Sequence, residues 1–303
     1  MSIEERVHWK DINTNNKNGL LKKYKHLHLK ENKSARNVSR IFIIAYCMLI
    51  AYPIIFVIIT SLKPTSEFYV NIWGLPRTWA FENYAVAWNT AKIGTYMFNS
   101  VIIVTIVLVV TLIAGALAGY ALSRFRIKYA ELIMLAILAC TMLPSEAVLM
   151  PLYLVTGELG ITGTKAALIL PYIGWGLPMT IYIFRNFFDT IPNELLEAAR
   201  MDGCDDIKAF THIAIPIMTP AIATNAIFIF VSWWGELLWA TVELASSSMK
   251  TIPIGMVSFS SQFGTNWGPM CAAICIILIP LVVFFFFVQK YFVKGLTSGA
   301  VKG

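Results

Sequence analysis

Two carboxylates stand out in this sequence because each lies within a long apolar run. Glu146 is the only charged residue in the run 132–155, and Glu236 lies near the end of the run 213–242. An acidic side chain in an apolar segment of membrane length is unfavourable, and where it occurs it commonly binds a cation, relays a proton or contacts a polar substrate. Both glutamates are therefore candidates for the wall of a polar path.

The motifs of several other kinds of chemistry are missing from the sequence. A nucleotide site needs the spacing G-x-x-x-x-G-K-[ST], and the nearest string, at 157–165, has the wrong spacing. Three of the four histidines lie in the first 40 residues, so no Ser-His-Asp set is expected. The five cysteines form no CxxC pair, which argues against a zinc site or a disulfide framework. We expect a chain that is not an enzyme, hydrolyses no ATP, and binds no cofactor or metal.

An acidic segment between two apolar runs has the pattern of two short helices. Residues 185–212 contain six Asp and Glu against three Lys and Arg. Thr190 is placed to cap a first helix, and Gly203 can end it in the left-handed conformation. Asp205 or Asp206 can then cap a second helix. The first helix would have one apolar face, formed by Leu195, Leu196, Ala198 and Ala199.

Six apolar runs have the length that crosses a bilayer, about 20 residues. They are 41–62, 97–123, 132–155, 166–184, 213–242 and 269–289. The chain is 57% hydrophobic and 14% charged, whereas soluble proteins have roughly 45–50% and 25%. The sequence therefore predicts an all-α polytopic membrane protein with six transmembrane helices.

The positions of Lys and Arg predict how this protein is oriented. With the amino terminus inside, 19 of them lie on the cytoplasmic side and five outside, as the positive-inside rule requires. The formal charge of +7 is thus explained by topology and not by a nucleic-acid partner. The expected organisation is a basic cytoplasmic arm at 1–40, a six-helix domain at 41–294 with the loop 185–212, and a cytoplasmic tail at 295–303.

This topology places both glutamates towards the outer side of the bilayer. At 1.5 Å per residue, Glu146 lies about 21 Å and Glu236 about 34 Å from the inner ends of their spans. Asn225 and Trp234 belong to the same span as Glu236, and these four residues could line a path that opens outwards. A structural interpretation stays open as well. Glu146 could bond helix-end groups freed by nearby prolines, and the tryptophans could anchor their span at the interface.

The two short helices need a surface to pack on. Isolated helices of fewer than about 12–15 residues are marginally stable in water. An amphipathic helix can lie on lipid headgroups, but an acidic helix suits an anionic leaflet poorly. Docking onto a protein partner is therefore favoured over lying on lipid.

The first of these helices carries a motif. It reads Glu197-Ala198-Ala199-Arg200-Met201-Asp202-Gly203, and Phe210, Ile213, Ile215 and Pro216 follow. This pattern resembles the EAA motif of bacterial ABC importer permeases. Thr-Ile-Pro-Ile-Gly at 251–255 and the tail 295–303 resemble the carbohydrate branch of that family, which includes the maltose permease MalG. Two positions depart from the pattern: Cys204 stands where Ala is usual, and Ile215 where Leu is common.

The resemblance implies a type I ABC importer permease fold and roles for two segments. It makes 185–212 the coupling region that sits in a cleft of a separate ATPase subunit, through Glu197, Ala198, Ala199, Asp202, Gly203, Phe210 and Pro216. It places the tail between two ATPase subunits, through Gly295, Gly299, Lys302 and Gly303. Small residues suit an extended strand there, and a tail without fixed structure is the alternative.

The implied function is that of a permease subunit of an ABC importer for a sugar or oligosaccharide, in the bacterial cell membrane. The implied partners are a second permease subunit similar to MalF, two ATPase subunits that bind ATP and Mg²⁺, an extracellular substrate-binding protein and the lipid bilayer. The polar path would then admit sugar, with aromatic rings stacking on it. The rival hypothesis is an ion-gradient-driven secondary transporter with Glu146 as its ion site, and a membrane scaffold is a weaker third.

Overall fold

The computed structural model describes residues 33–261 and 264–300, with side chains for 37–260 and 264–291. The chain divides into two units, 1–56 and 57–303, which are described separately. Helix α2 (Lys33–Ser61) supplies the described part of the first unit. Its apolar side chains are mostly exposed, as expected of a helix in contact with lipid or with another protein.

The second unit is almost wholly helical. Its longer helices are α5 (Ile93–Arg124), α6 (Ala130–Ala139), α7 (Ser145–Glu158), α8 (Ala166–Asp189), α9 (Asn193–Met201), α12 (Thr219–Trp234) and α15 (Trp267–Ala300). Its shorter helices are α3 (Thr65–Val70), α4 (Glu82–Ala85), η1 (Val86–Thr90), η2 (Cys140–Met142), α10 (Asp206–Ala209), η3 (Phe210–Ala214), α11 (Ile215–Ile217), α13 (Leu238–Leu244) and α14 (Ile252–Val257). Strands β1 (Ser260–Ser261) and β2 (Gly264–Thr265) form a small antiparallel hairpin, with Ser260 opposite Thr265.

Among the residues that the structure describes, four helices are long and apolar enough to cross a membrane, and the number rises to six if each of two bent helix pairs is one span. The third predicted span bends by 96° between α6–η2 and α7. Pro144 lies at this break with an extended backbone, ψ 129°. The segment Asp206–Ile217 also bends by 74° against α12.

The fifth predicted span is shorter than the sequence suggested. Helix α12 ends at Trp234, Gly235 follows, and α13 is a separate helix. The depths of Glu146 and Glu236 in a membrane stay a prediction, but they cannot be obtained from a constant rise per residue, because one span bends and the other breaks.

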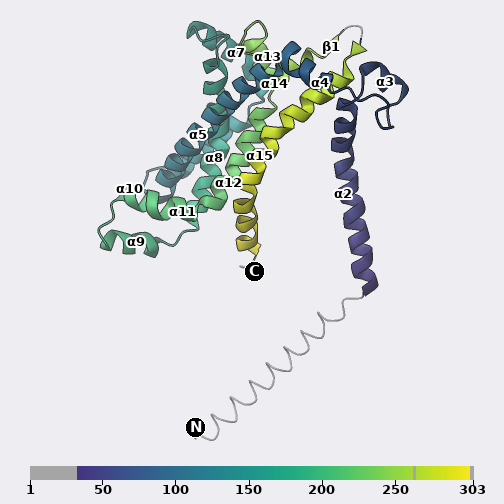
Figure 1. Cartoon of the computed structure of the whole chain (residues 1–303). Coiled ribbons are helices and arrows are strands. Elements are labelled where there is room, and N and C mark those ends of the chain that lie inside the picture. The colour runs from purple at the N-terminus through teal and green to yellow at the C-terminus, as the bar shows by residue number, and fades with distance from the viewer. Residues whose placement is uncertain (1–32, 262–263, 301–303) are drawn as a thin grey trace, which may run out of the picture. The chain divides into compact units, whose positions relative to one another are not determined.

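Helices α5 and α8 form the centre of the second unit. Gly115 and Gly119 of α5 face α8 closely. A Cβ added at Gly115 would lie 2.5 Å from Thr180 Cγ2, and a Cβ added at Gly119 would lie 3.0 Å from the backbone nitrogen of Arg185. Small residues at such crossings allow two helix backbones to approach. Helix α12 packs on both helices of this pair, and α15 packs on α12 (Figure 1).

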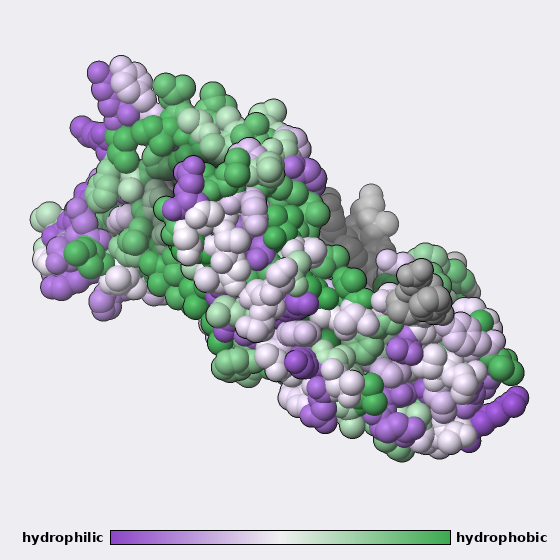
Figure 2. Space-filling view, turned by 90° about the horizontal axis from the view of Figure 1, so that it is seen from above, coloured by the Kyte–Doolittle hydropathy of each residue, from purple (hydrophilic) through white to green (hydrophobic). Residues whose placement is uncertain are grey.

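The two ends of this helix bundle differ. Helices α9, α10 and α11 lie at one end, here called the α9 end, whereas α7, α13, α14 and the β-hairpin lie at the other, the α13 end (Figure 1). Viewed onto the α13 end, hydrophobic and hydrophilic residues lie side by side on the surface (Figure 2). Helix α5 runs from one end to the other, so it can connect them mechanically.

The segment between α2 and α5 is folded around a buried lysine. Lys63 is fully buried and donates hydrogen bonds to the carbonyls of Asn71 (2.8 Å) and Ile72 (3.0 Å). Burial lowers the pKa of its ammonium, and the nearby Glu67 carboxylate partly opposes this. The pKa of Glu67 is itself below its usual range, chiefly because the Arg77 amide donates to it at 2.8 Å. This segment therefore has a defined structure of its own.

The carboxyl-terminal segment is helical as far as the structure describes it. Helix α15 continues to Ala300, so the expected extended strand is wrong for residues 295–300, which include Gly295 and Gly299. Lys302 and Gly303 lie outside the described residues. A helix that has already crossed the bundle can extend through a small-residue segment that would be a poor helix in isolation.

Candidate functional site

The predicted helix, glycine turn and helix are present as α9, Gly203 and α10, here called the α9–α10 hairpin. Gly203 has φ +84°, the left-handed conformation that the sequence led us to expect. Asp205 caps α10, since its carboxylate accepts the Lys208 amide at 2.7 Å. Asp206 instead pairs with Arg200 at 2.8 Å.

The start of the hairpin differs from the prediction. Helix α8 extends to Asp189, so the connection between α8 and α9 begins only at Thr190. The Thr190 hydroxyl donates to the Phe187 carbonyl of α8 at 2.7 Å and does not cap α9. Pro192 holds the N-cap position without a side-chain cap. The predicted capping role of Thr190 is therefore wrong, because the preceding helix includes the residues assigned to the loop.

The apolar residues of α9 point in two directions. Leu196 and Ala199, three residues apart, are buried, whereas Leu195 and Ala198 are exposed. The single apolar face expected from the sequence is thus wrong. Exposed apolar and acidic side chains together form what we call the outer α9–α10 surface: Leu195, Glu197, Ala198, Met201, Asp202 and Ile207. Met201 and Ile207, on either side of the turn, are 88% and 74% exposed.

The remaining predicted residues of this region lie apart from that surface. Phe210 is half-buried, and its ring lies 4.9 Å from that of Tyr120 on α5. Pro216 is exposed in α11, just before the bend into α12. Phe210 therefore holds the hairpin to the bundle, and Pro216 lies in the segment that leads into the bend.

Arg124, the last residue of α5, is a site residue that the sequence reasoning missed. Its guanidinium donates to the carbonyls of Phe188 and Ile191, the latter at 2.7 Å, and to the Asn193 side chain. From the sequence it was counted only as one of the charges that orient the protein. Nothing in the local pattern identifies its partners, which lie more than 60 residues away in the sequence.

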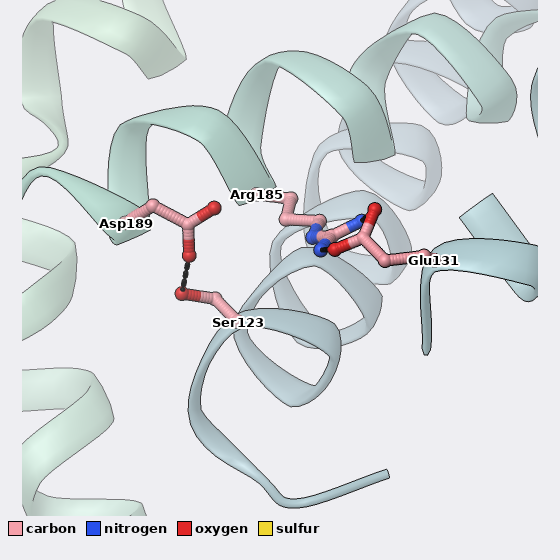
Figure 3. Close-up of polar contacts among 4 residues, drawn as sticks. All are labelled: Ser123, Glu131, Arg185 and Asp189. Carbon is pink, nitrogen blue, oxygen red and sulfur yellow. Dashed lines mark hydrogen bonds and ion pairs between the residues drawn. The ribbon is translucent and has the colours of Figure 1, made fainter. Parts of the chain in front are cut away.

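Two further polar contacts join helices at the α9 end. Ser123 of α5 donates to Asp189 of α8 at 2.5 Å, and Arg185 of α8 pairs with Glu131 of α6 (Figure 3). Together with Arg124 they connect the ends of three helices next to the hairpin. The hairpin is therefore mounted on a rigid base.

A pocket of about 770 Å³ lies at the α13 end between α7, α8 and the break after α12. Its lining includes both glutamates that the sequence singled out, Glu146 and Glu236, and the tryptophans Trp175, Trp233 and Trp239. Trp233 stacks against Trp175 with ring centroids 6.0 Å apart. The pocket thus combines carboxylates with broad aromatic faces, which suits a polar ligand that also has apolar faces.

The two glutamates of the pocket have different surroundings. Glu236 accepts the amides of Trp239 (2.8 Å) and Ala240 (3.0 Å) at the start of α13, and the Tyr172 hydroxyl also donates to it. Glu146 is exposed in the first turn of α7 and accepts the Ser145 hydroxyl at 3.1 Å. The sequence suggested that Glu146 bonds free helix-end groups. In the structure it is Glu236 that does so, at the start of α13.

Two predicted path residues lie outside the pocket. Asn225 is 2% exposed and donates to the Ala221 carbonyl of its own helix at 3.2 Å. Trp234 is buried against Phe230, with ring centroids 5.1 Å apart. Adjacent residues of a helix point about 100° apart, so Trp233 faces the pocket while Trp234 faces away from it.

A third glutamate, which the sequence reasoning did not single out, lies in α13. Glu243 is 4% exposed and accepts the Thr156 hydroxyl at 2.5 Å and the Gly163 amide at 3.4 Å. It connects α13 to the end of α7 and to the turn that follows. Within the described part of the chain, no three His, Cys, Asp or Glu residues lie together in a way that could hold a metal ion.

Comparison with known proteins gives consistent similarities. Residues 111–298 match the family described as the binding-protein-dependent transport system inner membrane component. The chain is 36% identical over 263 residues to the probable ABC transporter permease protein YurM of Bacillus subtilis, covering 87% of each chain. It is also 36% identical over 263 residues to the trehalose transport system permease protein SugB of Mycobacterium tuberculosis, covering 86% of this chain and 94% of SugB.

The fold is likewise similar to a solved one. A chain of a bacterial ABC transporter involved in import of the acidic polysaccharide alginate superposes with a TM-score of 0.71 at 23% identity. The superposition covers 87% of this chain and 98% of that chain. At this identity the likeness concerns the fold, which is that of an ABC importer permease.

Proposed function

Because this chain belongs to the family of inner membrane components of binding-protein-dependent transport systems, we propose that it is a permease subunit of an ABC importer for a sugar or oligosaccharide. The chain is a multi-pass membrane protein and is not itself an enzyme. The carbohydrate substrate is supported by the relative named for trehalose transport. The rival hypothesis, an ion-gradient-driven transporter using Glu146, has no support among these relatives.

In this importer, partner subunits supply the energy and the remaining parts of the transport machinery. Two ATPase subunits bind ATP and Mg²⁺, a second permease subunit completes the membrane channel, and a binding protein delivers the sugar from outside. The excess of Lys and Arg supports an orientation with both termini and the α9 end in the cytoplasm. The ATPase subunits then meet the permease at the α9 end.

The observation that carries the coupling role is the outer α9–α10 surface. It exposes apolar side chains at the tip of a hairpin that is fixed to the bundle on its other side. We assign Glu197, Ala198 and Asp202 to the contact with an ATPase subunit and Gly203 to the turn that presents them, whereas Ala199 supports the hairpin from inside. Closure of the paired ATPase subunits would displace the hairpin and move the bundle as a rigid body.

Two further assignments belong to the same proposal. The carboxyl-terminal tail, from Gly295 and Gly299 to Lys302 and Gly303, contacts the ATPase subunits. The pocket at the α13 end lies on the sugar path, where Trp175 and Trp233 offer ring faces and Glu146 can accept hydrogen bonds from sugar hydroxyls. Asn225 and Trp234 support the wall of the path from behind.

Substitution at Ala198 tests the docking surface in the reconstituted importer. Ala198→Trp adds bulk to an exposed position, so the subunit should fold normally. Overpacking the interface costs about 1–3 kcal/mol, so association with the ATPase subunits should weaken about five- to 150-fold. Ala198→Ser is the matched control and should behave like the wild type. Wild-type ATPase stimulation and sugar uptake by Ala198→Trp would disprove the assignment.

A further inference from the structure

The last turn of α5 holds the α9–α10 hairpin and its connection to α8 through several side-chain contacts. Arg124 contacts three successive parts of the connection: the Phe188 carbonyl in the last turn of α8, the Ile191 carbonyl, and the side chain of Asn193, the first residue of α9. The planar guanidinium of Arg124 therefore joins the end of α8 to the start of α9.

The neighbouring residues of α5 hold the rest of the hairpin. Tyr120 packs against Phe188 at 5.2 Å and against Phe210, beyond α10, at 4.9 Å between ring centroids. Ser123 donates to Asp189 at 2.5 Å. The entry to the hairpin and its exit thus both rest on the same turn of α5.

The covalent route out of the hairpin is less direct. Beyond α10 and η3, the chain bends by 74° before α12 begins. Helix α5, in contrast, is one unbroken helix of 32 residues that packs closely on α8 through Gly115 and Gly119. A displacement of the hairpin is therefore transmitted more directly through α5 than around the bend.

We propose that Arg124 is the positioning residue that makes α5 move together with the α9–α10 hairpin. The inference rests on the proposed coupling function and adds the route by which motion reaches the membrane helices. A guanidinium suits this task because its donors lie in a fixed planar fork, while a lysine ammonium is a single point of charge. A cation is also favoured beside the free carbonyls at the end of α8.

The test uses the whole importer reconstituted in lipid vesicles, with both permease subunits, the ATPase subunits and the binding protein. Arg124→Gln removes the charge and the fork, and it should lower the amount of sugar transported per ATP hydrolysed about tenfold, as expected for loss of one or more charge-assisted hydrogen bonds. Arg124→Lys should have an intermediate effect. Arg126→Gln removes the same charge from an exposed position two residues further on and should leave the ratio unchanged.

The amount of sugar transported per ATP hydrolysed is measured only on complexes that assemble. It therefore distinguishes a positioning role of Arg124 from a role in folding alone. Wild-type transport per ATP in Arg124→Gln would overturn the inference. If that variant does not assemble, Asn193→Ala removes one of the three acceptors, and an unchanged ratio in that variant would overturn the inference instead. Ala198→Trp in the same assay tests the docking surface separately, so the two failures can be told apart.

Discussion

Glu146 and Glu236 have the same side chain but different numbers of hydrogen-bond donors around them. Two backbone amides and the Tyr172 hydroxyl surround Glu236, so its carboxylate is occupied in holding the start of α13. Glu146 is exposed to the pocket and bonded to the adjacent Ser145. At the scale of single residues, Glu236 thus stabilises the pocket wall, while Glu146 remains available to a ligand.

Substituting these glutamates should separate stability from transport. Glu236→Ala removes a helix cap, so the free energy of unfolding should fall by about 1–2 kcal/mol. Glu146→Gln should leave the melting temperature unchanged and reduce sugar uptake. Thermal unfolding of the purified complex and uptake into vesicles measure the two effects. Equal melting temperatures for Glu236→Ala and the wild type would contradict the capping role.

At the scale of elements, the angle between α9 and α10 depends on one backbone conformation. Gly203 has φ +84°, and within the described part of the chain a Cβ there would meet no atom within 4 Å. A substitution would therefore cause backbone strain without a steric clash. The turn can be altered without changing the residues on the outer α9–α10 surface.

We expect Gly203→Ala to weaken coupling by distorting this turn. An L-residue in the left-handed conformation costs roughly 1–2 kcal/mol, which favours a changed angle between the two helices. Stimulation of ATPase activity by the binding protein should decrease accordingly. Gly157→Ala is the matched control, because Gly157 lies within α7 and its added Cβ would be 3.9 Å from Thr162 Oγ1. Equal ATPase stimulation in the two variants would argue against a role for the turn.

At the scale of the whole molecule, the bundle presents different chemistry at its two ends. The α9 end carries the acidic hairpin, and the α13 end carries the pocket. Exposed apolar side chains cover much of α5 and α15 between these two ends, as expected for helices in contact with lipid or another permease.

Labelling by a membrane-impermeant thiol reagent should reveal the orientation of the two ends. In a variant without the five native cysteines, Met201→Cys should react only from the cytoplasmic side and Leu75→Cys only from outside. Both positions are suitable because their side chains are 88% and 70% exposed. Reaction of Met201→Cys in intact cells, before the membrane is opened, would reverse the proposed topology.

Local patterns in the sequence were sufficient for the class of fold, for the six apolar segments and for the family. The turn at Gly203 and the cap at Asp205 were also predictable, because each depends on neighbours within a few residues. The prolines near Glu146 indicated freed helix-end groups, but the 96° change of direction at Pro144 was not predicted. Apolar composition continues through a break, so it does not record a change in helix direction.

The tertiary structure decided which side chains meet. Glu236 contacts Tyr172, 64 residues earlier, and Arg124 contacts Ile191, 67 residues later. It also decided that Trp233, and not Trp234, faces the pocket. Such choices depend on how helices rotate and cross once they pack, and composition and spacing along one segment contain no record of that rotation.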